Sequence, residues 1–140
     1  MSKKIKLGVV GDPIDHSLSP LIHSKFGALN GVEIDYQPFH VVQKDLIEFI
    51  KDFFNKGGHG LNITLPHKLN CVHAADILSS EVELLGAANT LSKNQDEQIV
   101  ASSTDGLGLI RDCSDKNIEI SNKRVLILGA GGASQSIIPA

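Results

Sequence analysis

The stretch Asn62-Ile63-Thr64-Leu65-Pro66-His67-Lys68 closes a short apolar run that begins at Gly60. Proline has no N–H to donate and biases the preceding residue away from helical angles, so a strand over 60–65 has to stop at Pro66. In an α/β sheet, ligands bind in the crevice outside the carboxyl ends of the strands. The stretch therefore predicts a carboxamide, a hydroxyl and an amine at one sheet edge; a solvated surface lysine is the alternative.

Strand and helix patterns alternate around this stretch. Short apolar runs predict strands over 6–11, 35–41 and 60–65, and helical spacing of apolar residues predicts helices over 19–30 and 46–56. Ser19-Pro20 predicts a helix start with Ser19 as the N-cap. The alternation predicts an α/β fold, with a mostly parallel mixed sheet and helices on both faces.

The second half of the chain predicts further helices and strands, and its last strand leads into a glycine-rich loop of the kind that binds nucleotides. A polar helical stretch is predicted over 68–85, a hairpin with strands over 88–91 and 99–102, and a helix over 105–112. A buried strand is predicted over 124–128, running directly into Gly129-Ala130-Gly131-Gly132-Ala133-Ser134. Glycines there would let the backbone approach a pyrophosphate, whose charge a helix N-terminus stabilises. A glycine-rich turn without a ligand is the alternative reading.

Composition excludes several classes of function. The 140 residues are one ordinary domain in size, and a formal charge of −3 gives no basic face for nucleic acid. No apolar run reaches the roughly 20 residues of a membrane span. Cys71 and Cys113 form neither a disulfide framework nor a CxxC motif, and the six histidines lack metal-ligand spacing. We expect a cytoplasmic protein with no metal, membrane or nucleic-acid partner.

Five motifs, read together in order, point to one family. They are Gly11-Asp12-Pro13 with His16-Ser17-Leu18-Ser19-Pro20 and His23, then 62–68, Gly86-Ala87-Ala88-Asn89-Thr90, Thr104-Asp105-Gly106-Leu107-Gly108 and 129–134. In these motifs the chain resembles the N-terminal half of shikimate dehydrogenases. The motifs extend over nearly the whole chain, and their order makes the signal specific.

The resemblance implies an oxidoreductase with NADP as cofactor. The reaction would be the reversible reduction of 3-dehydroshikimate to shikimate, in the biosynthesis of aromatic amino acids. It also implies a substrate-binding and catalytic domain over 1–104, an interdomain helix and linker over 105–122, and the start of a Rossmann-type NADP domain over 123–140. We expect a truncated fragment with little or no activity alone, an exposed apolar face, and possible self-association through an incomplete sheet.

The family's catalytic pair falls on Lys68 and Asp105. Hydride addition to a ketone develops negative charge on oxygen, which an ammonium group can stabilise and protonate, while a carboxylate orients the lysine. By the same resemblance, the substrate carboxylate is bound by Ser17 and Ser19. The resemblance assigns the ring hydroxyls to Asn62, Thr64 and Asn89, and the cofactor to Gly129, Ala130, Gly131, Gly132, Ala133 and Ser134.

The sequence departs from the family pattern at two positions, and three alternatives to the implied function remain open. Ser24 and Ser103 stand where the family often has asparagine, and both shorten the reach of a hydrogen-bonding side chain. The substrate could be quinate or another small hydroxy acid. The chain could also be a shikimate-binding module without chemistry, although Lys68 with Asp105 favours an enzyme. A purely structural fragment that pairs through its unfinished sheet is the third alternative.

Overall fold

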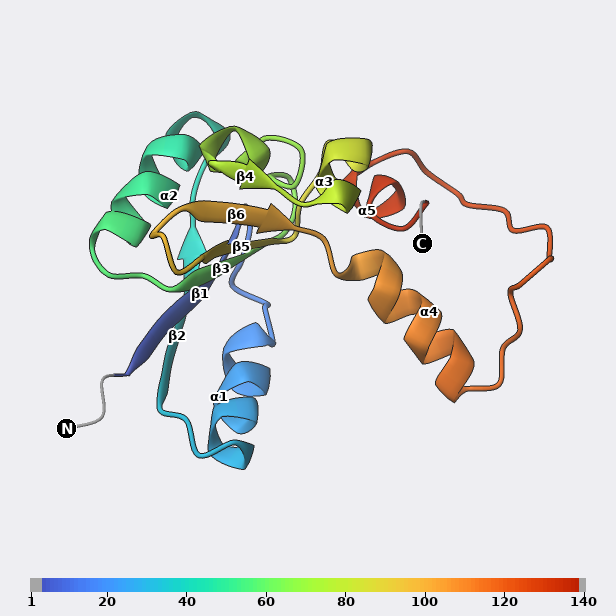
Figure 1. Cartoon of the computed structure of the whole chain (residues 1–140), viewed down its shortest axis with the longest axis horizontal. Coiled ribbons are helices and arrows are strands. Elements are labelled where there is room, and N and C mark those ends of the chain that lie inside the picture. Colours follow the sequence, from blue (N-terminus) through green and yellow to red (C-terminus); the bar gives the residue numbers. More distant parts are fainter. Residues whose placement is uncertain (1–3, 139–140) are drawn as a thin grey trace.

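The computed structural model describes residues 4–138 of the chain. Over these residues the strands form one six-stranded sheet in the order β2-β1-β3-β5-β6-β4 (Figure 1). The strands are β1 (Ile5–Gly11), β2 (Ile34–His40), β3 (Gly60–Ile63), β4 (Ile77–Leu78), β5 (Thr90–Lys93) and β6 (Ile99–Ser102). The helices are α1 (Ser19–Leu29), α2 (Leu46–Asn55), α3 (Ser80–Leu85), α4 (Asp105–Asp115) and α5 (Gly132–Gln135), with 3₁₀ turns η1 (Gln43–Asp45) and η2 (Cys71–Ala74).

The sheet is mixed, and parallel pairs predominate as predicted. Strand β1 pairs in parallel with both β2 and β3, and β4 pairs in parallel with β6. The predicted hairpin of β5 and β6 is antiparallel, and β5 also lies antiparallel to β3. Pro38 lies in β2 at the edge of the sheet, which is the place where a strand tolerates the missing N–H.

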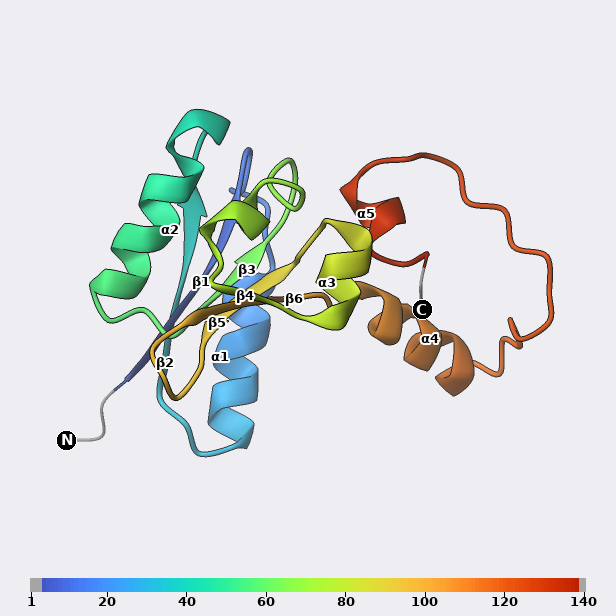
Figure 2. The same cartoon turned by 45° about the horizontal axis from the view of Figure 1, so that its top comes forward.

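Helices cover both faces of the sheet, again as predicted. Side chains alternate along a strand, so Val10 and Val9 of β1 point to opposite faces. Val10 packs in a large core with Leu46, Ile50 and other residues of α2. Val9 packs in a smaller cluster with Ile14 and Tyr36, on the face where α1 lies. The two helices therefore sandwich the β1–β2–β3 end of the sheet (Figure 2).

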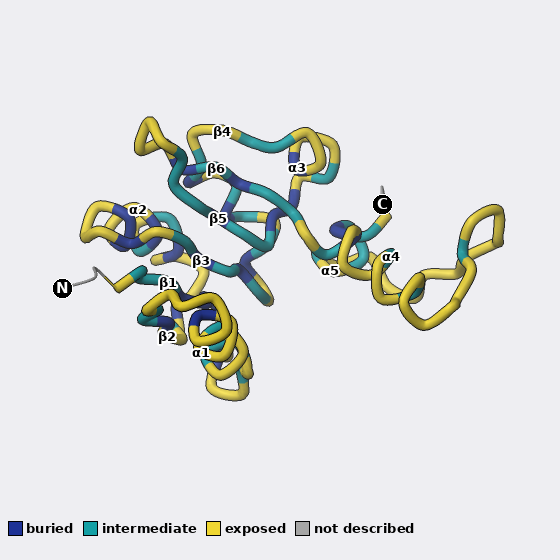
Figure 3. The backbone as a smooth tube through the Cα atoms, turned by 60° about the horizontal axis from the view of Figure 1, so that its bottom comes forward, coloured by how far each residue is buried: buried dark blue, intermediate teal, exposed yellow. Residues whose placement is uncertain are grey.

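Helix α1 exposes most of its apolar residues to solvent. Leu21 is 56% exposed, Phe26 53% and Leu29 82%, whereas Gly27 is the residue of this helix that is buried. Most of the α1 tube is coloured as exposed in Figure 3. The small residue at 27 is required because an added Cβ would lie 2.7 Å from the Val32 carbonyl oxygen. Much of the apolar surface of α1 is therefore exposed to solvent.

The predicted cap of α1 was wrong by one position. The helix begins at Ser19 itself, its N-cap is Leu18, and Leu18 makes no capping hydrogen bond through its side chain. The capping hydroxyl belongs instead to Ser17, whose Oγ accepts a hydrogen bond from the Ser19 N–H at 3.3 Å. The helix starts where predicted, but a different serine satisfies its first N–H group.

The continuous helix predicted over 68–85 was also wrong. The segment forms η2, then the two-residue strand β4, and only then the short helix α3. Asp76 draws the chain alongside β6, because its N–H donates to the Ile99 carbonyl and its carboxylate accepts the Ile99 N–H, both at 2.8 Å. Ser79 then caps α3 by accepting the Val82 N–H at 3.4 Å.

Two strand predictions also need correction. Strand β3 ends at Ile63 and not at Leu65, although the Thr64 N–H still donates to the Val10 carbonyl at 2.9 Å. The buried strand predicted over 124–128 is absent: these residues have no regular structure, with Leu126 82% and Leu128 87% exposed (Figure 1). No strand of residues 4–138 lies beside them, so their N–H and C=O groups have no ladder to join. The helix predicted after the glycines is present as α5.

No helix within residues 4–138 combines the length and the apolar character that crossing a bilayer requires.

Candidate functional site

Lys68 and Asp105 form an ion pair at the carboxyl end of β3. Lys68 Nζ donates to Asp105 Oδ2 at 2.5 Å, and the two side chains are 13% and 27% exposed. Lys68 lies in the turn after β3, and Asp105 is the first residue of α4, directly after β6. Charge-assisted hydrogen bonds between partly buried groups are stronger than neutral ones. The sheet thus brings together the two residues that the family resemblance assigns to catalysis.

A buried histidine anchors the turn that carries Lys68. The His67 side chain is fully buried, and its Nε2 lies 2.6 Å from the Val41 carbonyl oxygen, which can only accept a hydrogen bond. Nε2 therefore donates to this carbonyl, and Nδ1 lies 3.0 Å from Gln43 Oε1. The His67 carbonyl in turn accepts the N–H of Cys71 at 2.9 Å. These bonds fix the backbone on both sides of Lys68.

Asn89 contacts the second carboxylate oxygen of Asp105. Its Nδ2 donates to Asp105 Oδ1 and to Thr104 Oγ1, both at 2.8 Å. Its Oδ1 accepts from Thr90 Oγ1 at 2.8 Å and from the Thr104 N–H at 3.1 Å. A carboxamide has two donor hydrogens and two acceptor lone pairs, so all four hydrogen bonds of Asn89 are made within the chain. Asn89 thereby holds the carboxylate oxygen of Asp105 that Lys68 does not contact.

Asn62 connects this group to a tyrosine that sequence reasoning missed. The Tyr36 hydroxyl donates to Asn62 Oδ1 at 2.7 Å, and Asn62 Nδ2 contacts Thr90 Oγ1 at 3.5 Å. Burial raises the pKa of Tyr36 to about 12, with a hydrogen bond to the Ser19 side chain acting in the opposite direction. The phenol is therefore protonated at neutral pH and able to donate. Its signal in the sequence is its inward-facing position in β2.

The serines gather in a separate hollow beside the first loop. A cavity of about 220 Å³ is lined by Val9, Pro13, Ile14, His16, Ser17, Ser19 and Thr64. Ser17, Ser19 and Thr64 therefore line one small space. Because Tyr36 bonds both Ser19 and Asn62, it links this hollow to the network around Lys68.

The glycine loop packs directly against the lysine. A Cβ added at Gly132 would lie 3.2 Å from Lys68 Cβ and 3.6 Å from Lys68 Cδ, so a side chain there would press on the lysine stem. Gly129 has φ +117, a conformation that favours glycine, and residues 129–131 are exposed. An open glycine backbone of this kind fits the pyrophosphate of a dinucleotide. The predicted cofactor loop and Lys68 are thus neighbours.

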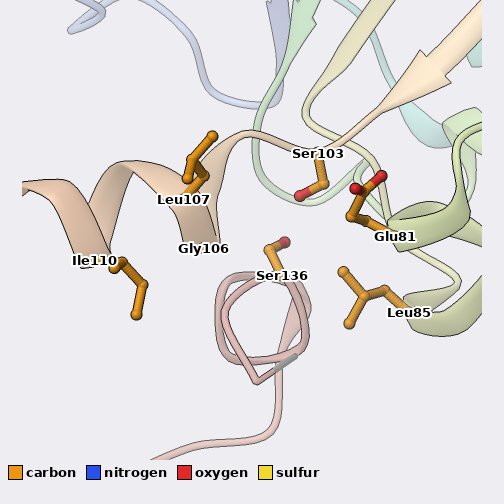
Figure 4. Close-up of a pocket in the computed structure, with 7 residues that line it drawn as sticks. All are labelled: Glu81, Leu85, Ser103, Gly106, Leu107, Ile110 and Ser136. Atoms are coloured by element: carbon orange, nitrogen blue, oxygen red, sulfur yellow. The ribbon is translucent and has the colours of Figure 1, made fainter. Parts of the chain in front are cut away.

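A second hollow lies between α3, α4 and the segment of α5 (Figure 4). It has a volume of about 350 Å³ and is lined by Glu81, Leu85, Ser103, Gly106, Leu107, Ile110 and Ser136. The Ser103 hydroxyl is buried without a hydrogen-bond partner among the residues described. The serine that departs from the expected asparagine therefore leaves a polar atom unsatisfied, two residues from Asp105. In the described part of the chain, no three His, Cys, Asp or Glu side chains gather as a metal-binding group.

Comparisons with known proteins identify one family. The family model described as "Shikimate dehydrogenase substrate binding domain" matches residues 9–91, more than half of the chain. A shikimate dehydrogenase (NADP(+)) from Marinobacter nauticus is 43% identical over 131 residues, which cover 93% of this chain and 48% of that protein. The chain spans about half the length of the curated relatives it matches.

Solved structures share the fold. Shikimate 5-dehydrogenase from Listeria monocytogenes, solved with shikimate and NAD, superposes with a TM-score of 0.89 at 34% identity, covering 98% of this chain and 47% of that one. The Thermus thermophilus enzyme, solved with NADP(H) and shikimate, gives a TM-score of 0.88 at 28% identity, covering 95% and 50%. The match over 9–91 shows that this chain belongs to the family of shikimate dehydrogenase substrate-binding domains.

Proposed function

We propose that this chain is the substrate-binding and catalytic half of an NADP-dependent shikimate dehydrogenase. The reaction would be the reversible reduction of 3-dehydroshikimate to shikimate, a step toward the aromatic amino acids. The observation that carries the proposal is the Lys68–Asp105 ion pair, which lies at the carboxyl end of β3 and beside the glycine loop. A module that only binds its ligand would not need a lysine held against a carboxylate.

The chemistry follows from the charges of this pair. NADPH, when bound, supplies the hydride, and NADP⁺ accepts it in the reverse direction. As the ketone carbon becomes a CH–OH group, its oxygen gains negative charge, which the Lys68 ammonium stabilises and to which it gives a proton. In the reverse direction the neutral Lys68 amine takes the hydroxyl proton. Asp105 holds the lysine Nζ in place throughout.

The substrate would lie between the serine hollow and the ion pair. We assign the substrate carboxylate to Ser17 and Ser19, whose hydroxyls share a cavity with Thr64. The ring hydroxyls are assigned to Asn62, Thr64 and Asn89. Asn89 already makes four hydrogen bonds, so a bound hydroxyl would have to share or replace one of them.

The glycine loop would hold the cofactor. We assign NADP to residues 129–134, an assignment supported by the exposed glycine backbone and its contact with Lys68. The corresponding division of the chain is a substrate-binding part over 1–104, a connecting helix and linker over 105–122, and the beginning of the nucleotide domain over 123–140. We also propose a cytoplasmic location, which the free thiols of Cys71 and Cys113 support because disulfides persist mainly in oxidising compartments.

The proposal is tested by a chimera in which these 140 residues replace the corresponding half of the Marinobacter nauticus relative. We expect NADP-linked oxidation of shikimate, and Lys68→Met is expected to lower kcat by roughly a hundredfold or more. The control is Lys51→Met, which removes an exposed lysine of α2 and is expected to leave kcat unchanged. A folded chimera that oxidises quinate in preference to shikimate would change the substrate assignment. A folded chimera that oxidises neither acid would refute the proposal.

A further inference from the structure

Thr90 lies between the two asparagines of the candidate site. It is the first residue of β5, directly opposite Asn62 of β3 in the antiparallel register. Its Oγ1 donates to Asn89 Oδ1 at 2.8 Å and accepts from Asn62 Nδ2 at 3.5 Å. Nothing in the sequence assigned this hydroxyl a role, because a threonine in a strand is ordinary.

The direction of each hydrogen bond in this chain follows from its neighbours. Tyr36 donates to Asn62 Oδ1, so the Asn62 amide is oriented with Nδ2 toward Thr90. A threonine hydroxyl has one hydrogen, and here it is donated to Asn89 Oδ1. The Asn89 carboxamide is thereby oriented with Nδ2 toward Asp105. The chain of donors runs in one direction and ends on the carboxylate that holds Lys68.

We propose that Thr90 is a positioning residue for the Lys68–Asp105 pair. Its hydroxyl and the Thr104 N–H together hold the Oδ1 end of the Asn89 carboxamide, so that Nδ2 faces Asp105. Without the Thr90 hydroxyl, Asn89 Oδ1 keeps the Thr104 N–H as its donor, and the amide gains freedom to rotate away from Asp105. The link to catalysis rests on the proposed function, whereas the orientation of Asn89 does not.

The first test reads the Asn89 amide directly in the 140-residue chain. NMR gives the shifts and solvent-exchange rates of its side-chain NH₂ protons in the wild type and in Thr90→Val, an isosteric variant without the hydroxyl. We expect shifted signals and exchange faster by roughly three- to tenfold, the effect of losing one hydrogen bond. Thr90→Ala is expected to do the same, so the test does not depend on how valine packs.

Two control variants distinguish the effect of the Thr90 hydroxyl from a general effect of substitution in β5. Thr90→Ser keeps the hydroxyl and is expected to restore the wild-type Asn89 signals. Ser92→Val makes a similar change two residues along β5, on the same face, and is expected to leave Asn89 unchanged. Unchanged Asn89 signals in both Thr90→Val and Thr90→Ala would overturn the proposal, and so would a failure of Thr90→Ser to restore them.

A second measurement tests whether the orientation of the Asn89 amide affects shikimate binding. Shikimate titrated into the same variants is expected to bind Thr90→Val roughly three- to tenfold more weakly than the wild type, Thr90→Ser or Ser92→Val. Equal affinity in all four would contradict a role of Thr90 in the working site. If the wild type binds no shikimate, the proposed function fails, while the Asn89 signals still decide whether Thr90 orients that amide.

Discussion

Lys68 Nζ lies 2.5 Å from Asp105 Oδ2, although 37 positions separate the two residues in the chain. The sheet makes this contact possible, because β3 and β6 flank β5 and both of their carboxyl ends lead into the same region. Lys68 leaves the sheet by the turn after β3, and Asp105 by the helix after β6. The hairpin of β5 and β6 thus returns the chain to the lysine.

Asp105→Asn is expected to reduce turnover strongly in the chimera. The amide keeps the shape of the carboxylate but removes the charge that holds the Lys68 ammonium, so we expect kcat to fall by roughly a hundredfold. The matched control is Asp112→Asn on the same helix, where the exposed carboxylate pairs only with Lys116 in the contacts described. Equal kcat values for Asp105→Asn and the wild type would remove Asp105 from the catalytic pair.

Gly132→Ala is expected to displace the Lys68 side chain. The added Cβ would meet Lys68 Cβ at 3.2 Å, so α5 or the lysine stem has to move. NMR spectra of the 140-residue chain should therefore show shifted Lys68 signals in Gly132→Ala. Gly131→Ala provides the control, because a Cβ at 131 has no atom within 4 Å. Identical Lys68 signals in the wild type and Gly132→Ala would contradict the packing of the loop against the lysine.

Local patterns predicted those elements whose partners are close in sequence or whose own periodicity is strong. Helix α2 follows from its spacing of Leu46, Ile50, Phe53 and Phe54, all of which are buried in the core. The hairpin follows from two apolar runs around a polar turn. The pair of Lys68 and Asp105 came from the family resemblance, because no spacing in the sequence indicates a contact over 37 positions.

The failures have a common physical cause, which is the presence or absence of a strand partner. Residues 76–78 pair with β6, and this pairing overrides the helical pattern over 68–85. Residues 124–128 have an apolar strand pattern but no neighbouring strand within residues 4–138. Tyr36 and Thr90 were missed as site residues because their roles depend on side chains from other strands. Such contacts cannot be derived from local sequence.

Leu46→Ala and Leu29→Ala are expected to differ widely in stability. Leu46 is fully buried in the α2 core, so its truncation leaves a cavity and should cost about 2–5 kcal/mol of unfolding free energy. Leu29 is 82% exposed at the end of α1, and its truncation should cost less than about 0.5 kcal/mol. Denaturant unfolding measures both. A large loss for Leu29→Ala would mean that α1 is covered in solution.

The two cysteines are expected to react at very different rates. Burial raises the pKa of the Cys71 thiol to about 12, and Cys113 is partly exposed on α4. The thiolate is the reactive form, so a thiol reagent at pH 8 should modify Cys113 quickly and Cys71 only after unfolding. Cys113→Ser should abolish the fast reaction. A fast reaction that persists in Cys113→Ser would show that Cys71 is accessible.

Alkaline pH is expected to destabilise the fold. The folded state raises the pKa of both Cys71 and Tyr36 to about 12, above their ordinary values of 9.0 and 10.0. The folded state therefore binds more protons than the unfolded state, and stability falls as the pH rises from about 9 toward 12. Unfolding free energies measured over this range should decline, less steeply in Tyr36→Phe. An equal slope in both proteins would show that Tyr36 makes no contribution.

Leu126 and Leu128 are expected to drive self-association. Both lie on the exposed segment between α4 and α5, and exposed strand-prone apolar runs invite pairing between chains. The double variant Leu126→Lys with Leu128→Lys should reduce any rise in apparent mass with concentration during size-exclusion chromatography. Leu84→Lys, which changes an exposed leucine of α3, serves as the control. A wild-type chain that stays monomeric at high concentration would contradict this expectation.

The central claim is that the hydroxyls, carboxamides and ion pair described above form a shikimate site, and it is tested most directly by titrating shikimate into this chain. Backbone amide NMR follows each residue during the titration. The site predicts shifts that cluster at Ser17, Ser19, Thr64, Lys68 and Asn89, with quinate as the comparison ligand. The absence of any shift at these residues with millimolar shikimate would contradict the claim.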